Sequence, residues 1–259
     1  MVDLIPQARE AKWSALIFTV DMPVPGSRYR DYHSGLAGES WLSGNIKRFS
    51  QAMMKPSWAL DVGLLGMPHK LGNVTPLLKN NSGLEDFMEW MSNNFDPTVS
   101  WKDIEFVRDH WDGPIILKGL MHVDDAIKAS KIVDAIYLSN HGGRQIDIAP
   151  SPLQILPETR KKLGPKFPII IDSGFYSGQD ICKGLMLGAD FVMTGRPLII
   201  GLAALGDKGA NHVHDILKDE LANVMEQVCA KNIEELKSED VVLEAVSYTH
   251  LTLPTNREV

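Results

Sequence analysis

The chain has 259 residues, 44% of them hydrophobic, and a formal net charge of −7. This allows one large or two small domains with a real core, and the absence of a basic stripe argues against a nucleic-acid binder. The two cysteines, Cys182 and Cys229, form no C-x-x-C pair, so we expect no disulfide framework and no metal site, and we assign the chain to the reducing cytoplasm.

The sequence predicts neither a membrane-spanning segment nor a signal peptide. No apolar run approaches the roughly 20 residues that a membrane span needs. The N-terminus has no basic start followed by an apolar block, so we expect no signal peptide.

Five short apolar runs are each followed by polar or glycine-rich residues, and we expect each run to form a strand. Their apolarity is continuous rather than alternating, which suits a parallel sheet that is covered on both faces. The runs span residues 15–21, 114–119, 135–140, 168–172 and 191–195.

Helical patterns follow three of these runs, over residues 123–132, 151–164 and 178–189. Ser151 and Pro152 suit the N-cap and the first helical position of the second one. A longer amphipathic stripe over 213–228 is interpreted as packing. The repeated order of strand, loop and helix predicts a Rossmann-type sheet or a (β/α)₈ barrel.

Two regions interrupt this order. Residues 32–103 form a long excursion rich in tryptophan and methionine, and segments of this length are usually lids, binding loops or attachment surfaces. Residues 247–259 show no periodicity, so they are either non-native sequence or a disordered tail. We therefore expect one α/β domain over 1–246, followed by that tail.

Polar residues gather where the expected strands end, as in the stretch "LSNHGGRQID". The carboxyl ends of parallel strands meet at one edge, where the active sites of α/β sheets and barrels lie. The residues at these ends are Thr19, Asp21, Lys118, Ser139, His141, Arg144, Asp172, Ser173, Gly174, Gly195 and Arg196.

Each of these residues also has a structural interpretation. Asp21 could cap a helix or join a buried ion pair, and Gly195–Arg196 could be a helix N-terminal turn with a solvated arginine. Lys118 stands near a buried strand end, where its charge needs an anionic partner. A lone histidine is usually structural, but Arg144 follows His141 by three residues with two glycines between them, which favours a functional pair.

At this point three stretches carry a resemblance. "FTVDMPVPGSRYRD", "SNHGGRQID" and "GLMLGADFVMTGRP" resemble the FMN-dependent L-2-hydroxy-acid dehydrogenases and oxidases, a family that includes L-lactate dehydrogenase, glycolate oxidase and mandelate dehydrogenase. "GLEDFMEWMSNNFDPTVSWKD" is most similar to the bacterial quinone-linked L-lactate dehydrogenases. The resemblance runs from about residue 10 to about residue 245. It implies a (β/α)₈ TIM barrel, here its last five βα units, with FMN at the carboxyl edge.

The resemblance also implies residue roles. His141 would take a proton from the 2-hydroxy acid while Asp21 orients its imidazole. Arg144 would clamp the substrate carboxylate, with Arg28 as a second, more mobile guanidinium, and Lys118 would stabilise the reduced flavin ring. The other flavin contacts would come from Thr19 and Ser139 at the ring, and from Asp172, Ser173, Gly174, Gly195 and Arg196 at the ribityl chain and phosphate.

The implied reaction is oxidation of L-lactate to pyruvate, with electrons passed to a quinone or another acceptor. Mandelate and glycolate are alternative substrates. The excursion at 32–103 would be either a peripheral contact with the inner face of the cell membrane or a soluble lid over the flavin, and family members are commonly homotetramers. Two further alternatives are another FMN-binding barrel, such as a type 2 isopentenyl-diphosphate isomerase, and an inactive fragment.

The sequence departs from the family pattern in two ways. Tyr176 stands in "DSGFY" where the family has an arginine for the FMN phosphate, so we expect weaker FMN binding by about 1.5–3 kcal/mol, partly offset by Arg196. The family also has three strands before the first run here, so we expect a fragment whose five strands cannot close a barrel and whose sheet edges stay open.

Overall fold

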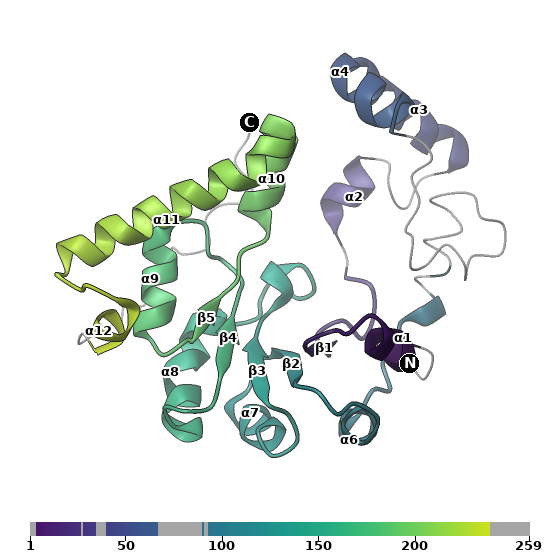
Figure 1. The fold of residues 1–259 in the computed structure, drawn as a ribbon. Coiled ribbons are helices and arrows are strands. Elements are labelled where there is room, and N and C mark those ends of the chain that lie inside the picture. Colours follow the sequence, from purple (N-terminus) through teal and green to yellow (C-terminus); the bar gives the residue numbers. More distant parts are fainter. Residues whose placement is uncertain (1–3, 27, 35–39, 67–89, 91–92, 239–259) are drawn as a thin grey trace.

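The protein is described by a computed structural model over residues 4–26, 28–34, 40–66, 90 and 93–238. At its centre is a sheet of five parallel strands in the order β1-β2-β3-β4-β5 (Figure 1). Each strand pairs with the next one along the chain, as in a barrel, whereas the strand order of a Rossmann sheet reverses at a switch point. The five βα units therefore form a partial (β/α)₈ barrel. The strands are β1 (Leu16–Thr19), β2 (Ile115–Leu120), β3 (Ala135–Leu138), β4 (Ile169–Ile171) and β5 (Phe191–Val192).

Four of the five strands end earlier than the apolar runs predict, because the last residues of these runs leave the sheet to build the loops at its carboxyl edge, whereas β2 ends one residue later, at Leu120. In β2 the pairing with β3 shifts register between Lys118 and Leu120. Gly119 lies at this irregularity with φ +104°, and a Cβ on it would lie 2.6 Å from the Cβ of Asp21. A glycine is therefore required here, because it lets Asp21 approach the end of β2.

The helices predicted between the strands are present. Ser151 caps α8 by accepting a hydrogen bond from the backbone N–H of Leu153, and Pro152 is its first residue, as predicted. The predicted helices are α7 (Val123–Ala129), α8 (Pro152–Leu163), α9 (Gly178–Met186) and, after the last strand, α11 (Gly209–Gln227). Three further helices were not predicted: α6 (Trp101–His110), α10 (Arg196–Leu205) and η4 (Gly206–Lys208).

The excursion and the residues just before it contain a group of helices that lie away from the sheet in Figure 1. Within the described residues these are α2 (Tyr29–His33), α3 (Trp41–Met53), α4 (Pro56–Trp58) and the π-helical segment η1 (Ala59–Leu64). Residues 67–89 of the excursion and the tail 247–259 lie outside the described residues. The chain also has α1 (Leu4–Glu10) near its start and α12 (Ile233–Ser238) after α11.

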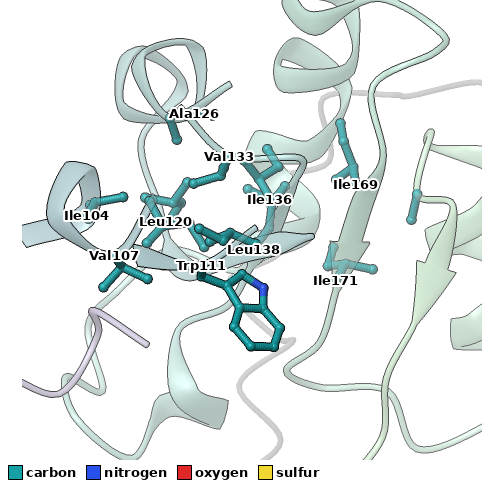
Figure 2. Close-up of a cluster of buried hydrophobic side chains, with 14 of the residues drawn as sticks. Ile104, Val107, Trp111, Leu120, Ala126, Val133, Ile136, Leu138, Ile169 and Ile171 are labelled. Atoms are coloured by element: carbon teal, nitrogen blue, oxygen red, sulfur yellow. The ribbon is translucent and has the colours of Figure 1, made fainter. Parts of the chain in front are cut away.

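The hydrophobic core lies between the sheet and the helices α6, α7 and α8 (Figure 2). Alternate residues of β2, β3 and β4 point into it, and Ile115, Leu117, Ile136, Leu138, Ile169 and Ile171 are fully buried.

The prediction that both sheet faces are covered holds for β3, whose four residues are all buried. It is wrong for β1 and β5, where Ile17 is 50% exposed and Phe191 62% exposed. These two are the edge strands of the sheet, so each has a neighbouring strand on one side only.

The stripe on α11 packs against α9 and α10, as predicted, through residues that include Leu217, Leu221 and Val224. The stripe is wider than its contact surface, however, since Ile216 on this helix and Val228, its C-cap residue, are exposed.

The amino ends of the strands carry two similar arginine–aspartate clamps. Arg108 of α6 donates to Asp134 at 2.8 Å and to the carbonyls of Trp111 and Gly113, while Asp134 accepts from the backbone N–H of Ile115, also at 2.8 Å. This clamp therefore ties α6, the loop after it and the starts of β2 and β3 together.

The second clamp repeats this arrangement one βαβ unit later. Arg160 of α8 contacts Asp190 at 2.5 Å and donates to three loop carbonyls. Asp190 accepts from the backbone N–H of Ile169 at 2.9 Å and from Lys237 of α12 at 3.0 Å. Because both clamps lie at the edge opposite the polar strand ends, we assign them to stability.

Asp190→Asn is expected to destabilise the fold by roughly 2–3 kcal/mol at pH 7, because the hydrogen bonds to Arg160 and Lys237 lose their charge. Burial alone would raise the pKa of Asp190, but the hydrogen bonds from Ile169, Lys237 and Arg160 outweigh it and lower the pKa below the ordinary 3.8. A carboxyl with a lowered pKa stabilises the folded state above its ordinary pKa and loses that contribution as the pH falls further.

Urea unfolding at several pH values measures this effect. The difference between the unaltered chain and Asp190→Asn should stay constant at neutral pH and shrink below pH 3.8. Asp112→Asn is the matched control, because its ion pair with Arg9 lies on the surface and should contribute little. An equal loss in both variants would contradict the assignment.

Candidate active site

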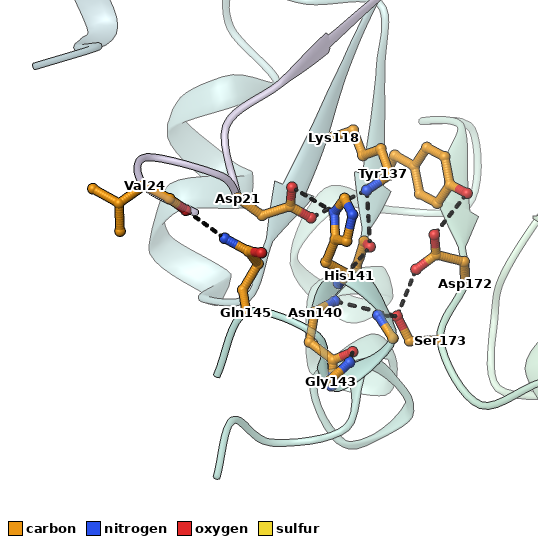
Figure 3. Close-up of polar contacts among 12 residues, drawn as sticks. Asp21, Val24, Lys118, Tyr137, Asn140, His141, Gly143, Gln145, Asp172 and Ser173 are labelled. Atoms are coloured by element: carbon orange, nitrogen blue, oxygen red, sulfur yellow. Dashed lines mark hydrogen bonds and ion pairs between the residues drawn. The ribbon is translucent and has the colours of Figure 1, made fainter. Parts of the chain in front are cut away.

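Asp21 joins the ends of three strands at the carboxyl edge of the sheet. One carboxylate oxygen accepts from Lys118 Nζ at 3.1 Å, and the other lies 3.2 Å from His141 Nδ1 (Figure 3). The side chain of Asp21 is only 9% exposed. Lys118 thus has the anionic partner that its position demands. An imidazole that donates from Nδ1 carries its lone pair on Nε2, so His141 is arranged to accept a proton there.

His141 occupies a tight turn, η3 (His141–Gly143). The three residues have φ values of +57°, +67° and +72°, the left-handed region. Gly142 and Gly143 adopt this region at no cost, whereas His141 needs support from its surroundings. Ser139 supplies part of it: its buried hydroxyl accepts from the backbone N–H of His141 at 3.0 Å and from Lys118 at 3.1 Å.

A cavity of about 330 Å³ opens beside this turn. Most of the residues predicted at the strand ends line it. These are Lys118, His141, Arg144, Asp172, Ser173, Gly174, Gly195 and Arg196.

Four predicted residues do not line the cavity. Asp21 and Ser139 lie directly behind Lys118 and His141 and contact both. Thr19 is exposed at the end of β1, where it pairs with Lys118. Arg28 is the N-cap residue of α2, and its buried Nε has no hydrogen-bond partner in the described part of the chain. The roles of Thr19 and Arg28 stay predictions.

The sequence did not reveal several residues of the site. Tyr137 donates from its hydroxyl to Asp172 at 2.9 Å, and Gln145 ties the turn to the segment after β1 by donating to the carbonyl of Val24 at 2.8 Å. Burial, followed by the charge of Asp172, raises the pKa of Tyr137, so its hydroxyl stays protonated. Tyr137 was not predicted as a site residue because it stands inside an uninterrupted apolar run.

The part of the cavity that Gly195 and Arg196 line suits an anion. α10 begins at Arg196 after Gly195, which has no side-chain cap, and the first backbone N–H groups of a helix attract phosphate. The guanidinium of Arg196 donates to the carbonyl of Gly142, so it connects this part of the cavity to the turn. Tyr176 lines the same region and is 44% exposed.

The lining of the cavity is partly apolar, with Phe175, Met193 and Ile199 among its residues. The basic side chains of Lys118, His141, Arg144 and Arg196 line the same cavity, so it suits a ligand that has both an apolar part and an anionic group. In the described residues, no helix is long and apolar enough to cross a membrane.

Comparison with known proteins identifies the family to which the chain belongs. The model of the FMN-dependent dehydrogenase family matches residues 1–243. An L-lactate dehydrogenase of Caulobacter sp. (strain K31) is 46% identical over 226 residues, which are 87% of this chain and 59% of the relative. An L-lactate dehydrogenase of Vibrio cholerae serotype O1 (strain M66-2) is 44% identical over 93% of this chain and 64% of the relative.

Solved structures agree with the sequence comparison. The monotopic membrane protein (S)-mandelate dehydrogenase matches with a TM-score of 0.80 and 34% identity, covering 90% of this chain and 61% of its own. A mandelate oxidase in complex with (S)-mandelic acid matches with a TM-score of 0.67 and 28% identity, over 91% of this chain and 57% of its own. The chain thus spans about three fifths of the length of the relatives it matches. It belongs to the FMN-dependent dehydrogenase family.

Proposed function

We propose that the chain takes part in the FMN-dependent oxidation of an L-2-hydroxy acid, with L-lactate converted to pyruvate. The observation that carries this proposal is the contact of Asp21 with His141, beside a cavity that Arg144 also lines. A base and a guanidinium on one turn suit a substrate that has a hydroxyl next to a carboxylate. The names of the curated relatives support lactate as that substrate.

The residues that would hold FMN line the cavity and divide between its ring and its phosphate. Lys118 would lie against the ring, and Gly174, Gly195 and Arg196 would hold the phosphate. FMN, when bound, takes up the two electrons that leave the α-carbon of the substrate.

The protein side chains would manage the proton and the substrate charge. His141 would accept a proton of the 2-hydroxy acid at Nε2, and the Asp21 carboxylate at Nδ1 would stabilise the imidazolium that forms. Arg144 would hold the substrate carboxylate with two parallel hydrogen bonds. Since His141 and Arg144 stand on one turn, the turn fixes the distance between base and carboxylate.

Steady-state turnover with an artificial electron acceptor tests the choice of substrate. L-lactate should have a higher kcat/KM than (S)-mandelate or glycolate. Preference for (S)-mandelate would instead move the assignment toward the mandelate dehydrogenase and oxidase neighbours. An FMN-binding chain that oxidises none of the three would favour the isomerase alternative, which needs no carboxylate clamp.

We also propose peripheral contact with a membrane through the apolar surface of α3 and α4. Leu42, Ile46, Phe49, Met53, Met54 and Trp58 on and beside these helices are each more than half exposed, and Lys47 and Arg48 stand among them in the sequence. Exposed apolar and basic residues on a helix suit an anionic lipid interface. The (S)-mandelate dehydrogenase neighbour is a monotopic membrane protein, which supports this proposal. A lipid-soluble quinone would be the matching electron acceptor, and a homotetramer stays a prediction.

A double variant, Phe49→Ser with Trp58→Ser, is expected to weaken binding to phosphatidylglycerol vesicles about 10-fold or more, because each side chain would bury apolar area in the lipid. Vesicle sedimentation measures the effect. Ile148→Ser, which removes a 93% exposed isoleucine elsewhere, is the control and should bind like the unaltered chain. Equal binding by all three proteins would favour the lid interpretation of the excursion.

A further inference from the structure

Side chains bind all four consecutive backbone N–H groups of the turn that carries His141. Asn140 and Gly142 donate to the hydroxyl of Ser173, at 3.3 and 3.0 Å (Figure 3). His141 donates to Ser139, and Gly143 donates to the side-chain carbonyl of Asn140, both at 3.0 Å. A turn with three successive left-handed residues is therefore fixed mainly by two serine hydroxyls from neighbouring strands.

The hydroxyl of Ser173 is fully used inside the protein. It accepts the two N–H groups of the turn and donates its own hydrogen to Asp172 at 2.7 Å. A serine hydroxyl has one hydrogen and two lone pairs, so no bonding capacity is left for a ligand. The expected contact of Ser173 with the cofactor is thus limited to its backbone.

Asp172 fixes the hydroxyl of Ser173 in turn. One carboxylate oxygen accepts from Ser173, and the other accepts from Tyr137 of β3 at 2.9 Å. Lys118 stands 5.3 Å from the centre of the Tyr137 ring. A series of hydrogen bonds therefore runs from Tyr137, which lies beside Lys118, through Asp172 and Ser173 to the turn that carries His141.

The backbone conformation of Ser173 indicates that its side chain is needed at this position. Its φ is +74°, a left-handed conformation that costs a serine free energy and that glycine adopts freely. A glycine at this position would relieve that cost but would leave two N–H groups of the turn without their acceptor.

From these contacts we propose that Ser173 is a positioning residue for the reaction proposed above. Its hydroxyl holds the turn so that the imidazole of His141 meets Asp21 while Arg144 faces the cavity. It acts through the turn and leaves cofactor affinity unchanged. The expected effect of Ser173 on the reaction rests on the proposed function. Its expected effect on the turn rests on the contacts alone.

Ser173→Ala and Ser173→Gly test the proposal in the full 259-residue chain, with Ser130→Ala as the control. Ser130 is the C-cap residue of α7, donates to the carbonyl of Ile127 in the last turn of that helix, and does not line the cavity. Amide hydrogen exchange without any cofactor is measured first. Both Ser173 variants should exchange at Asn140 and Gly142 about 10-fold faster or more, while the Ser130 variant should match the unaltered chain.

FMN affinity and the rate of reduction by L-lactate are measured next. The dissociation constant for FMN should stay within about twofold, and the rate should fall about 10- to 100-fold, since small displacements of a base are costly. The proposal is overturned if amide exchange at the turn is unchanged, or if the variants lose FMN affinity instead of rate. If the unaltered chain shows no reduction by L-lactate, the proposed function fails, and exchange still decides whether Ser173 holds the turn.

Discussion

His141→Gln is expected to lower the rate at which L-lactate reduces bound FMN by about 10²–10⁴-fold, the usual contribution of a general base. Glutamine keeps a polar side chain of similar length, but it cannot accept a proton near neutral pH. The contact with Asp21 at 3.2 Å then no longer stabilises a positive charge. FMN affinity should change little, since the base serves the substrate.

Anaerobic stopped-flow absorbance measures the rate of this single step. His214→Gln is the matched control, because His214 lies exposed on α11 and contacts its neighbour Asp215; it should react like the unaltered chain. A His141→Gln variant that keeps the rate within a few-fold would remove His141 from the reaction and return it to a structural role.

Asp21→Asn is expected to lower the same rate by about 10²–10⁴-fold through its effect on the imidazole. The side-chain amide can donate to His141 Nδ1, which would place the proton on Nε2 and block the atom that should receive the substrate proton. Because Asp21 would act through His141, its proposed role is that of a positioning residue.

The same variant should also lose stability. Lys118 and Asp21 are 15% and 9% exposed, and removing one partner of a largely buried pair costs about 3 kcal/mol. The rate is therefore measured at a temperature at which circular dichroism shows the variant folded. Asp124→Asn, whose carboxylate is 84% exposed, controls for the loss of a charge. A folded Asp21→Asn variant with an unchanged rate would contradict the assigned role.

The sequence predicted the fold well where its pattern was strong. All five strands and the helices α7, α8, α9 and α11 lie where continuous or periodic apolarity placed them. α10 was not predicted as a helix, because "RPLIIGLAAL" is apolar on all sides and has no period to read. The short α1 (Leu4–Glu10) was missed because seven residues contain too few turns of a helix for a pattern to show.

The position of the site could be predicted because parallel strands deliver their carboxyl ends to one edge. This rule alone led to Lys118, His141, Arg144 and Arg196, which line one cavity. It could not show which residues lie in the cavity and which lie behind it. Ser139 is entirely buried and serves the turn, and this depends on contacts between strands that the sequence does not display.

Tyr176 stands where the family pattern has an arginine, and its position in the structure bears on FMN binding. The residue lines the same cavity as Gly195 and Arg196, where α10 begins, so the expected loss of one charged contact would fall on the phosphate of FMN. Arg196 also lines this cavity, but it donates to the carbonyl of Gly142. Weaker FMN binding therefore stays the prediction for this chain.

The measurement that tests the central claim most directly is the visible spectrum of the chain with FMN, recorded without oxygen before and after addition of L-lactate. It is made on the 259-residue chain, and also on this chain joined to the part of the Caulobacter relative that it does not cover. Bands of bound oxidised flavin that bleach with L-lactate and persist with D-lactate are the predicted result. A flavin that binds in the joined protein but bleaches with neither isomer would contradict the assignment of His141 and Arg144 to an L-2-hydroxy acid.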